Sequence, residues 1–237
     1  MSKGCNAVKK LNQKVEFSST KKTKRRVKMK KVLSLLVAVV FVATAAGLAL
    51  AAPAQKSSAK SASKSSFKPF AVYVENASKD NHYAPSGWMG DYGDLKLNQA
   101  CTEAPRSGNT CIKITYSAKM AQSAGWTGIF WQQPANNWGE KKGGYDLTGA
   151  KQLTFWAKGG NGGEKIAEFK VGGITGEYPD SDSAQIGPIE LTKEWQKYTI
   201  NLAGKDLSNI IGGFCFAASK DDNPNGAIIY LDDIIFE

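Results

Sequence analysis

The sequence predicts an all-β protein, an antiparallel β-sandwich of the jelly-roll type. Apolar and polar residues alternate in short segments, turn residues recur about every eight to twelve positions, and no window carries a sustained helical apolar stripe. Gly-Gly pairs beginning at positions 143, 159, 162, 172 and 212 separate several of these segments. Eight or more strands in about 170 residues match two packed antiparallel sheets.

Alternation also assigns faces within the expected strands. Phe155 and Trp156 point to opposite faces, so the core and an exposed face are both open assignments for Trp156. In the fifth strand Ala167, Phe169 and Val171 are expected to point inward, while Trp195 caps a strand entrance and is interpreted as structural. The expected strands, in chain order, are Phe70–Glu75, Cys111–Tyr116, Thr127–Gln132, Gln152–Lys158, Lys165–Val171, Gln196–Leu202, Gly213–Ala218 and Ala227–Phe236.

Charge and composition divide the chain into three parts. Residues 1–54 contain 12 Lys/Arg and one acid, whereas residues 55–237 contain 19 Lys/Arg and 20 acids, so the excess of positive charge belongs to the leader. Residues 55–66 are almost entirely Ser, Ala and Lys, which is typical of a linker. Residues 67–237 suffice for one domain. A nearly neutral domain argues against nucleic-acid binding.

The leader has the features of a signal peptide. A basic run is followed by 21 uncharged residues from Val32 to Ala52, and small residues then fit cleavage near Ala51 or Ala54. We therefore expect a secreted, periplasmic or envelope protein. The alternative is an uncleaved membrane anchor, since 21 residues are long enough to span a bilayer. A second possible start at Met29 makes residues 1–28 a candidate over-extended gene start.

The cysteines predict one disulfide bond. Cys101 and Cys111 flank a turn-rich segment and would pair in an oxidising compartment, with two free thiols as the alternative. Cys215, between two phenylalanines, is expected to be a buried inert thiol. Because the only histidine is His82, and no Cys/His cluster has zinc spacing, zinc chemistry is not expected.

All six tryptophans lie between positions 88 and 195, and several stand among Gly, Asn and Gln. Indole is costly to leave in water, so such residues either fold back onto their loops or stack on a ligand. The sequence therefore indicates a stacking surface and leaves its ligand open.

Three motifs resemble segments of galactose-binding-like jelly rolls, the fold of many carbohydrate-binding modules. They are Asp146–Gly159, Leu191–Leu202 and the closing Tyr230–Ile234. The tryptophan-rich half also resembles a group of secreted bacterial domains, a likeness that brings no activity with it. Because these motifs are largely core and strand-edge positions, they specify the fold better than the ligand.

The resemblance implies carbohydrate binding on an open sheet face or on edge loops. An indole covers the apolar face of a sugar ring, and amides and carboxylates bind its hydroxyls. The alternative is that Trp131, which shares a face with Ile129, is core, and that the Asn-Asn-Trp-Gly loop is pinned by its own asparagines. The candidate sugar-binding residues are Trp88, Trp126, Trp131, Gln132, Asn136, Asn137, Trp138, Tyr178 and Asp180.

The resemblance also implies a structural calcium ion between the first and last strands. Glu75 and Asp232 occupy the corresponding positions, although a calcium shell needs six to eight oxygens. The alternative is that Asp232 and Asp233 are strand-edge charges.

Catalysis is not expected from this sequence. Glycosidases need two carboxyls facing one glycosidic bond, and the available acids lack the Glu-x-Asp-x-x-Glu spacing of a jelly-roll glucanase. The sequence thus favours a monomeric, non-catalytic domain that binds a polysaccharide or a cell-envelope glycan, with membrane contact only through an uncleaved leader. The alternative is an envelope-associated structural domain without a free ligand; a polysaccharide hydrolase or lyase comes third.

Overall fold

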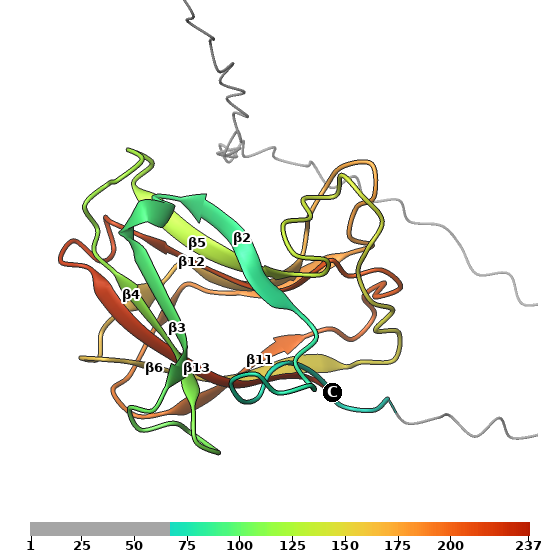
Figure 1. Cartoon of the computed structure of the whole chain (residues 1–237), viewed down its shortest axis with the longest axis horizontal. Helices are drawn as coiled ribbons and strands as arrows, with labels where there is room; N and C mark the ends of the chain where they lie inside the picture. The colour runs from blue at the N-terminus through green and yellow to red at the C-terminus, as the bar shows by residue number, and fades with distance from the viewer. Residues whose placement is uncertain (1–66) are drawn as a thin grey trace, which may run out of the picture. The chain divides into compact units, whose positions relative to one another are not determined.

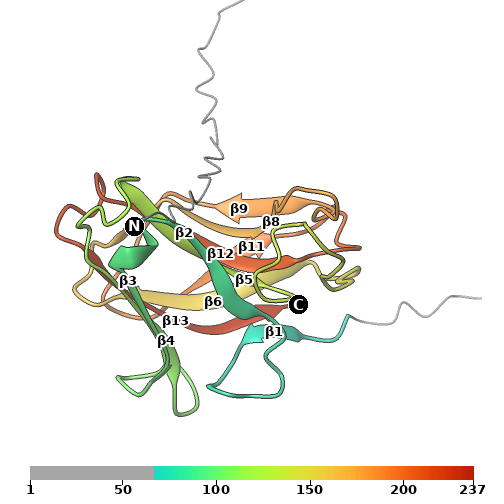
Figure 2. The ribbon, with the colours of Figure 1, turned by 45° about the horizontal axis from the view of Figure 1, so that its top comes forward.

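The computed structural model describes residues 67–237, which form two antiparallel β-sheets packed face to face (Figures 1 and 2). The predicted β-sandwich is therefore confirmed. The predicted leader and linker, including the cleavage positions, lie outside the described residues. No helix within 67–237 has the length and apolar character needed to cross a membrane.

One sheet, here the β13 sheet, has the order β11-β6-β13-β4-β3, and β1 adds to β13. Its strands are β1 (Phe70–Tyr73), β3 (Leu95–Cys101), β4 (Cys111–Tyr116), β6 (Gln152–Gly159), β11 (Gln196–Asn201) and β13 (Ala227–Phe236). The long β13 lies at the centre because its run of Ile, Leu and Tyr is buried along nearly its whole length.

The other sheet, here the β5 sheet, has the order β2-β5-β12-β8-β9. Its strands are β2 (Ala84–Gly90), β5 (Trp126–Gln132), β8 (Glu168–Gly172), β9 (Ser183–Ile186) and β12 (Gly212–Ser219). A short ladder joins β7 (Lys165–Ile166) to β10 (Ile189–Glu190), and one 3-10 turn, η1 (Tyr92–Asp94), follows β2.

The core between the sheets is rich in aromatic rings. Trp131 from β5 packs against Phe214 from β12, with ring centroids 5.6 Å apart, and Phe214 lies 5.1 Å from Phe155 of the opposite sheet. Phe169 completes this cluster at 4.7 Å from Phe155. These rings join the two sheets, so the aromatic alternation seen in the sequence is what closes the sandwich.

Two sequence expectations need correction here. Trp131 is 0% exposed, so the alternative assignment to the core is right, and the indole has no path to a ligand. Ala167 is exposed, although it was expected inside, because the predicted strand breaks there into β7 and β8. The break reverses the alternation, so Ile166 fills the inward position instead.

Trp131 gives a direct test of the core. Trp131→Ala removes a fully buried indole, and the unfolding free energy should fall by about 3–5 kcal/mol. Trp131→Phe should cost less, since it keeps a ring there and removes an indole Nε1 that is buried without a hydrogen-bond partner. Urea unfolding of both variants checks this, and equal losses for the two would contradict the packing described.

Candidate functional site

The outer face of the β5 sheet carries a second, smaller apolar cluster. Its members, here called the outer cluster, are Phe130, Ile174, Ile211 and Cys215, with Met89 packed against them. Phe130 and Met89 alternate with the inward residues of β5 and β2, so they point away from the core. These four residues are buried, so other parts of the protein cover this region of the outer face.

Three paired residues, Met89, Gly128 and Ala217, form the middle of this face. Gly128 on β5 pairs with Met89 on one side and Ala217 on the other. A Cβ at Gly128 would lie 2.6 Å from the Phe216 carbonyl oxygen and 2.9 Å from the Met89 methyl group, so only glycine fits there. Gly128 is buried under the Met89 side chain, so half-buried Met89 and Ala217, together with the backbone, form the floor of the face between its larger residues.

Two tryptophans stand on this face, at opposite ends of β5. Trp126 begins the strand on the outward side and is 41% exposed. Trp138, in the loop after β5, is 38% exposed, and its ring meets Phe130 edge-on with centroids 6.1 Å apart. Trp126 and Phe130 are four residues apart, which corresponds to about 13 Å along a strand. The two exposed indoles thus mark the ends of an elongated surface.

Polar side chains continue the face toward its far edge. In the register of the sheet, Cys215 lies beside Lys170 and Lys170 beside Gln185, while Ala217 lies beside Glu168. Gln185 is exposed, and Lys170 and Glu168 are half-buried. These groups supply amide, ammonium and carboxylate functions next to the apolar floor. We refer to the floor, the two tryptophans and this polar edge as the tryptophan face.

Buried amides fix the loop that holds Trp138. The Gln132 side chain donates to the Asn137 carbonyl oxygen (3.0 Å) and accepts from the Ser86 hydroxyl (2.9 Å). Asn137 donates to the Lys141 carbonyl oxygen (2.8 Å) and accepts from two backbone N–H groups of the same loop. Gln132 and Asn137 are 1% and 0% exposed, so they position Trp138 and cannot also bind a ligand. Asn136, in contrast, is exposed.

Asp180 has a similar positioning role in the neighbouring loop. Its carboxylate accepts from the backbone N–H groups of Ile174 (2.8 Å), Ile211 and Gly212 (3.2 Å), which joins residues 173–182 to the start of β12. Burial raises the pKa of Asp180 above its ordinary value, while the three N–H donors lower it. The carboxylate that was predicted at the rim of a sugar site is thus used inside the protein.

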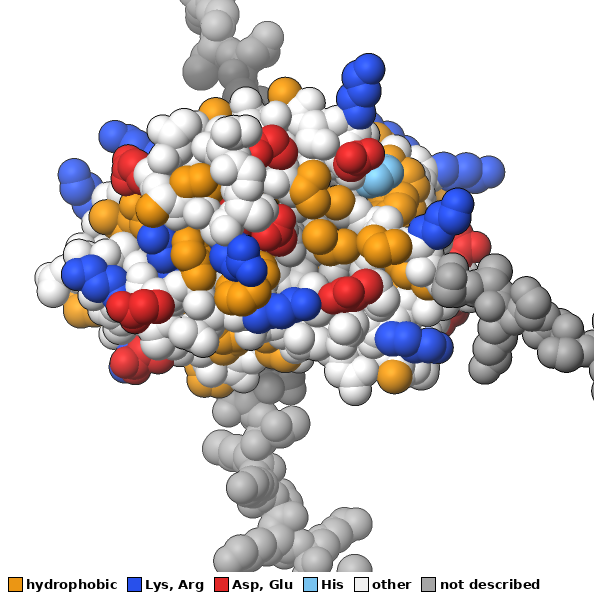
Figure 3. All heavy atoms as spheres, turned by 90° about the horizontal axis from the view of Figure 1, so that it is seen from below, with side chains coloured by type: hydrophobic (Ala, Val, Ile, Leu, Met, Phe, Trp, Pro, Cys, Tyr) orange, Lys and Arg blue, Asp and Glu red, His pale blue; other side chains and the backbone are white. Residues whose placement is uncertain are grey.

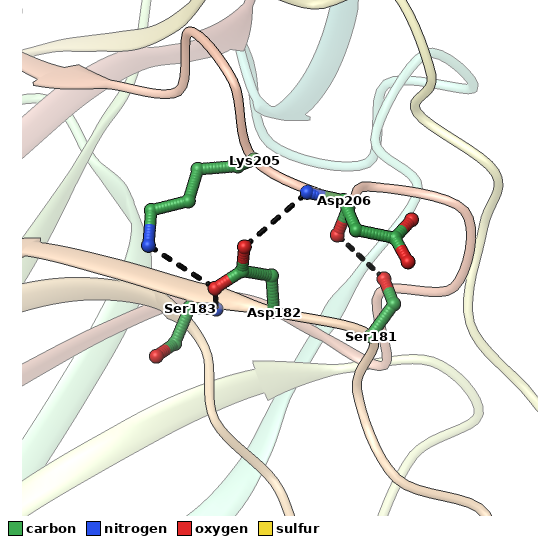
Figure 4. A network of polar contacts seen from close by, with 5 residues as sticks. All are labelled: Ser181, Asp182, Ser183, Lys205 and Asp206. Carbon is green, nitrogen blue, oxygen red and sulfur yellow. Dashed lines mark hydrogen bonds and ion pairs between the residues drawn. The ribbon is translucent and has the colours of Figure 1, made fainter.

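The same loop is tied down on its other side by the network in Figure 4. Asp182 accepts from Lys205 Nζ (3.1 Å) and from the backbone N–H groups of Ser183 (2.7 Å) and Asp206 (3.2 Å). Ser181 donates its hydroxyl to the Asp206 carbonyl oxygen (2.6 Å). These contacts explain how a loop rich in Gly, Ser and Asp keeps one conformation beside the tryptophan face.

Tyr178 lies where this loop meets the Trp138 loop. It is half-buried, and its backbone N–H donates to the Gly139 carbonyl oxygen (2.9 Å). A Cβ at Gly139 would lie 2.2 Å from the Thr175 carbonyl oxygen, which shows how closely the two loops approach. The structure thus brings Tyr178 close to the loop of Asn136 and Trp138. The distance between them in the sequence does not predict this contact.

Sequence reasoning missed the residue that positions Trp126. Asp91 is 0% exposed, and its carboxylate accepts from the backbone N–H groups of Gln122 (2.7 Å), Ala124 (2.9 Å) and Gly125 (2.7 Å). Its own N–H donates to the Trp126 carbonyl oxygen (2.7 Å). Although burial opposes it, this hydrogen bonding keeps the pKa of Asp91 below its ordinary value. The one signal in the sequence was an Asp directly after a Gly in a Trp-rich segment.

Trp88 does not join this surface. It is 38% exposed, but it alternates with Met89 on the edge strand β2 and so points to the other side of the sheet. Of the four tryptophans predicted to stack on a ligand, the structure therefore places two on one face, one in the core and one at an edge.

On the outer face of the β13 sheet, Lys and Arg side chains lie among hydrophobic ones (Figure 3), and some of these cations cover aromatic rings. Arg106 lies 4.1 Å from the ring centroid of half-buried Trp156, and Lys158 lies 5.2 Å from that of Trp195 and 4.9 Å from that of Tyr230. Trp195 also donates its indole N–H to the Ala104 carbonyl oxygen (3.1 Å). These rings make cation–π contacts within the protein.

The predicted disulfide is not formed in the structure. Cys101 and Cys111 face each other across the β3–β4 ladder, and both are free thiols in the structure. Burial raises the pKa of Cys111 to about 12, which disfavours the thiolate needed for disulfide exchange. Cys215 is also a buried free thiol, with a pKa raised by burial.

The predicted calcium ligands both contact the loop between β3 and β4. Asp232 accepts from the backbone N–H groups of Arg106 (2.9 Å) and Ser107 (3.3 Å), and Glu75 accepts from that of Asn109 (2.8 Å). Burial and the neighbouring Asp233 raise the pKa of Asp232 to about 6. The oxygens of these two carboxylates thus accept hydrogen bonds from backbone N–H groups, whereas calcium would need oxygens that are available as ligands. Residues 67–237 contain no group of three or more acidic, His or Cys side chains suited to a metal. As arranged, the donor set is incomplete for calcium.

Comparison with solved structures identifies proteins with a similar fold. A family 30 carbohydrate-binding module matches with a TM-score of 0.50 and 15% identity, covering 71% of this chain and 87% of that one. The family 30 module of a cellulosomal cellulase of Clostridium thermocellum matches with a TM-score of 0.50 and 16% identity, covering 72% and 97%. The fold resembles that of family 30 carbohydrate-binding modules. No protein-family model and no curated protein matches the sequence.

Within this carbohydrate-binding-module fold, Asp180 predicts a pH dependence of stability. Folding raises the pKa of Asp180, so this carboxyl group contributes its full stabilisation below the unfolded-state pKa of about 3.9. The contribution is lost as the pH rises through the higher folded-state pKa. The wild type should therefore gain stability relative to Asp180→Asn when the pH falls from 7.5 to 4, as measured by urea unfolding.

Asp182→Asn is the matched control for this measurement. Hydrogen bonds from Ser183 and Lys205 lower the pKa of Asp182, so the wild type should lose stability relative to this variant over the same fall in pH. Equal pH dependence in both comparisons would contradict the assignment to Asp180.

Calcium at Glu75 and Asp232 stays a prediction, and thermal melting tests it. If these carboxylates hold the ion, then a chelator lowers the melting midpoint of the wild type and added CaCl2 restores it, because bound ligand stabilises the folded state. Asp232→Asn should abolish both effects. A midpoint that is indifferent to chelator and to CaCl2 would remove this site.

Proposed function

We propose that this protein is a non-catalytic carbohydrate-binding domain whose ligand lies on the tryptophan face. The observation that carries this proposal is the pair of exposed indoles, Trp126 and Trp138, at the two ends of the floor formed by Met89, Ala217 and the backbone. A flat, low floor admits a sugar chain, and each indole offers an apolar surface for a sugar ring. The likeness to family 30 modules supports the fold on which this surface is built.

The ligand class follows from the shape and chemistry of the face. The surface is elongated and lies across a sheet, which suits an extended stretch of polysaccharide better than a single buried sugar. Lys170, Glu168 and Gln185 lie along its edge and can exchange hydrogen bonds with hydroxyl groups. Among the predicted ligand residues we retain Trp126, Trp138, Asn136 and Tyr178 as direct contacts. Gln132, Asn137 and Asp180 act indirectly, because their hydrogen bonds hold the loops beside the tryptophan face.

We propose that binding occurs without cleavage. Hydrolysis needs two carboxyl groups facing one sugar bond, and Asp180 and Asp182, beside this face, use their oxygens to accept hydrogen bonds within the protein. Glu168 is the one carboxylate of the polar edge. The same proposal includes export with a cleaved signal peptide, a monomeric state and a cell-envelope glycan as partner. These three parts rest on the sequence.

Affinity electrophoresis against a panel of soluble polysaccharides tests the function. The wild type should be retarded by at least one glycan, and Trp126→Ala and Trp138→Ala should each weaken binding by roughly three- to tenfold, the worth of one stacked ring. Trp88→Ala is the matched control: it removes an equally exposed tryptophan outside the face, and affinity should stay close to that of the wild type.

Three outcomes would count against parts of the proposal. Lack of retardation by any glycan would favour an envelope-associated structural domain instead. Retardation that Trp88→Ala abolishes and the other two variants retain would place the site at the edge of β2. An increase in reducing sugar ends, when a bound glycan is incubated with the protein, would show cleavage.

A further inference from the structure

The outer face of the β13 sheet gathers positive charge, although the domain as a whole does not. Residues 67–237 contain 16 Lys/Arg and 20 Asp/Glu, which gives a formal charge of −4. Cations nevertheless extend from this face on four of its strands and on the β3–β4 loop. A local excess of one sign on a domain of the other sign is suited to an oppositely charged partner. We call these residues the cation face: Lys96, Arg106, Lys113, Lys158 and Lys197.

The strand register places part of the cation face in a row that crosses the sheet. Asn98 of β3 lies beside Lys113 of β4. Lys113 lies beside Tyr230 of β13, which in turn lies beside Lys158 of β6. Neighbouring strands are about 4.8 Å apart, so these four positions span about 14 Å. The row is therefore long enough to contact several units of an extended ligand.

Aromatic rings restrict the cations of this row. Lys113 Nζ lies 5.5 Å and Lys158 Nζ lies 4.9 Å from the centroid of the Tyr230 ring, so both ammonium groups lie near the same ring. Lys158 Nζ also lies 5.2 Å from the ring centroid of Trp195. Because cation–π contacts hold these long side chains, less conformational entropy is lost when an anion binds them.

Carboxylates of the domain neutralise only part of this charge. Glu103 and Glu237 each form an ion pair with one lysine of the face, at 2.6 Å and 3.5 Å. Asp232 is 0% exposed and accepts backbone N–H groups of the β3–β4 loop. Exposed Arg106 and half-buried Lys158 form no ion pair within residues 67–237 and lie over indole rings instead. Their charges are thus available to an anion from outside.

A hollow opens at the β3 edge of the cation face. Its volume is about 420 Å³, which is within the range of small-ligand sites. Lys96 and Lys119 supply ammonium groups to its lining, and Thr115 and Ser117 supply hydroxyls. The one carboxylate of the lining, Asp94, is 5% exposed and accepts from the Ser117 hydroxyl (2.9 Å) and from a backbone N–H. The hollow therefore offers two cations and hydroxyl groups to one acidic sugar.

We propose that the outer face of the β13 sheet binds an acidic polysaccharide, a chain of uronate sugars. Thr115 of the hollow and Lys113 of the row point to the same side of β4, so one chain can occupy both. Each sugar of such a chain carries a carboxylate, and Lys and Arg bind carboxylates through charge-assisted hydrogen bonds. This site is separate from the tryptophan face, so it goes beyond the proposed function and does not depend on it.

The chemistry of the face favours acidic sugars over a nucleic acid. Nucleobases stack on open aromatic faces, whereas cations lie over the rings of Trp156, Trp195 and Tyr230. Asn98 and Thr115 add an amide and a hydroxyl that can exchange hydrogen bonds with sugar hydroxyls. The face thus combines positive charge with neutral polar groups and leaves no stacking platform for a base.

An NMR titration of the full chain with a galacturonate oligosaccharide tests the proposal. The indole N–H signals, assigned through Trp→Phe variants, report on each face separately, so binding elsewhere in the chain does not obscure the result. The signals of Trp156 and Trp195 should shift to saturation, and those of Trp126 and Trp138 should stay in place. The methyl ester of the same oligosaccharide has no charge and should leave all four unchanged. Raising NaCl from about 20 mM to about 200 mM should weaken binding, because salt screens the charges.

Two charge-removing variants locate the ligand. Lys158→Met keeps an apolar stem against the rings of the row, and Lys96→Met removes one ammonium group from the hollow. Each should raise the dissociation constant by about three- to fivefold, the worth of one exposed ion pair at low salt. Lys79→Met is the matched control: it removes an exposed cation from the loop after β1, outside the row and the hollow, and affinity should not change.

Four outcomes would overturn the proposal. The first is the absence of shifts at Trp156 and Trp195, and the second is equal shifts with the methyl ester. The third is undiminished affinity in both Lys158→Met and Lys96→Met. Shifts confined to Trp126 and Trp138 would instead assign the acidic sugar to the tryptophan face. An oligonucleotide that shifts the Trp156 and Trp195 signals at lower concentration than galacturonate would identify a nucleic acid as the ligand of this face.

Discussion

The alternation of side chains along β5 is the constraint on which both the core and the tryptophan face depend. Ile129 and Trp131 point inward and join the aromatic core, while Trp126 and Phe130 point outward and form the face. A slip of one residue in the register would move every one of these side chains to the wrong side of the sheet. Pairing with β2 and β12 on both sides fixes the register, so stability and recognition are set by the same ladder of hydrogen bonds.

The exposed tryptophans depend in turn on polar anchors. Buried Asp91 and Asn137 each accept two or more backbone N–H groups from a loop that has no regular secondary structure. Half-buried Asp180 accepts from Ile174 in its own loop and from Gly212 at the start of β12. Replacing one anchor with an apolar residue leaves several donors unsatisfied, at about 1–3 kcal/mol for each buried group. Such loops cannot be held by hydrophobic packing, because they are rich in Gly, Ser and Asn. Their rigidity lowers the entropy that a ligand must overcome.

The sequence predicted the central strands well and the edges poorly. Each of the eight expected segments contains a strand, because central strands carry the clearest apolar alternation. The four missed strands, β2, β3, β9 and β10, all lie at sheet edges, where one side of the strand is unpaired. In β2, Pro85 and Gly87 resemble a turn, yet an edge strand tolerates proline because one row of its N–H groups needs no partner.

The site was predicted in part, and the limit has a physical cause. Trp126 and Trp138 were recognisable because their neighbours are too polar to continue a core, but Gln132 and Asn137 looked equally suitable for a ligand. An amide or carboxylate beside an exposed aromatic ring is free to bind a ligand only when the adjoining loop has no unpaired backbone N–H groups. Where the loop has such groups, the side chain accepts their hydrogen bonds instead. That need arises from the fold of the loop, which a local sequence pattern does not specify. Asp180 and Asp91 therefore bind their own loops, and the polar groups beside the tryptophans that are left for the proposed ligand are those of Asn136, Tyr178 and the strand residues Glu168, Lys170 and Gln185.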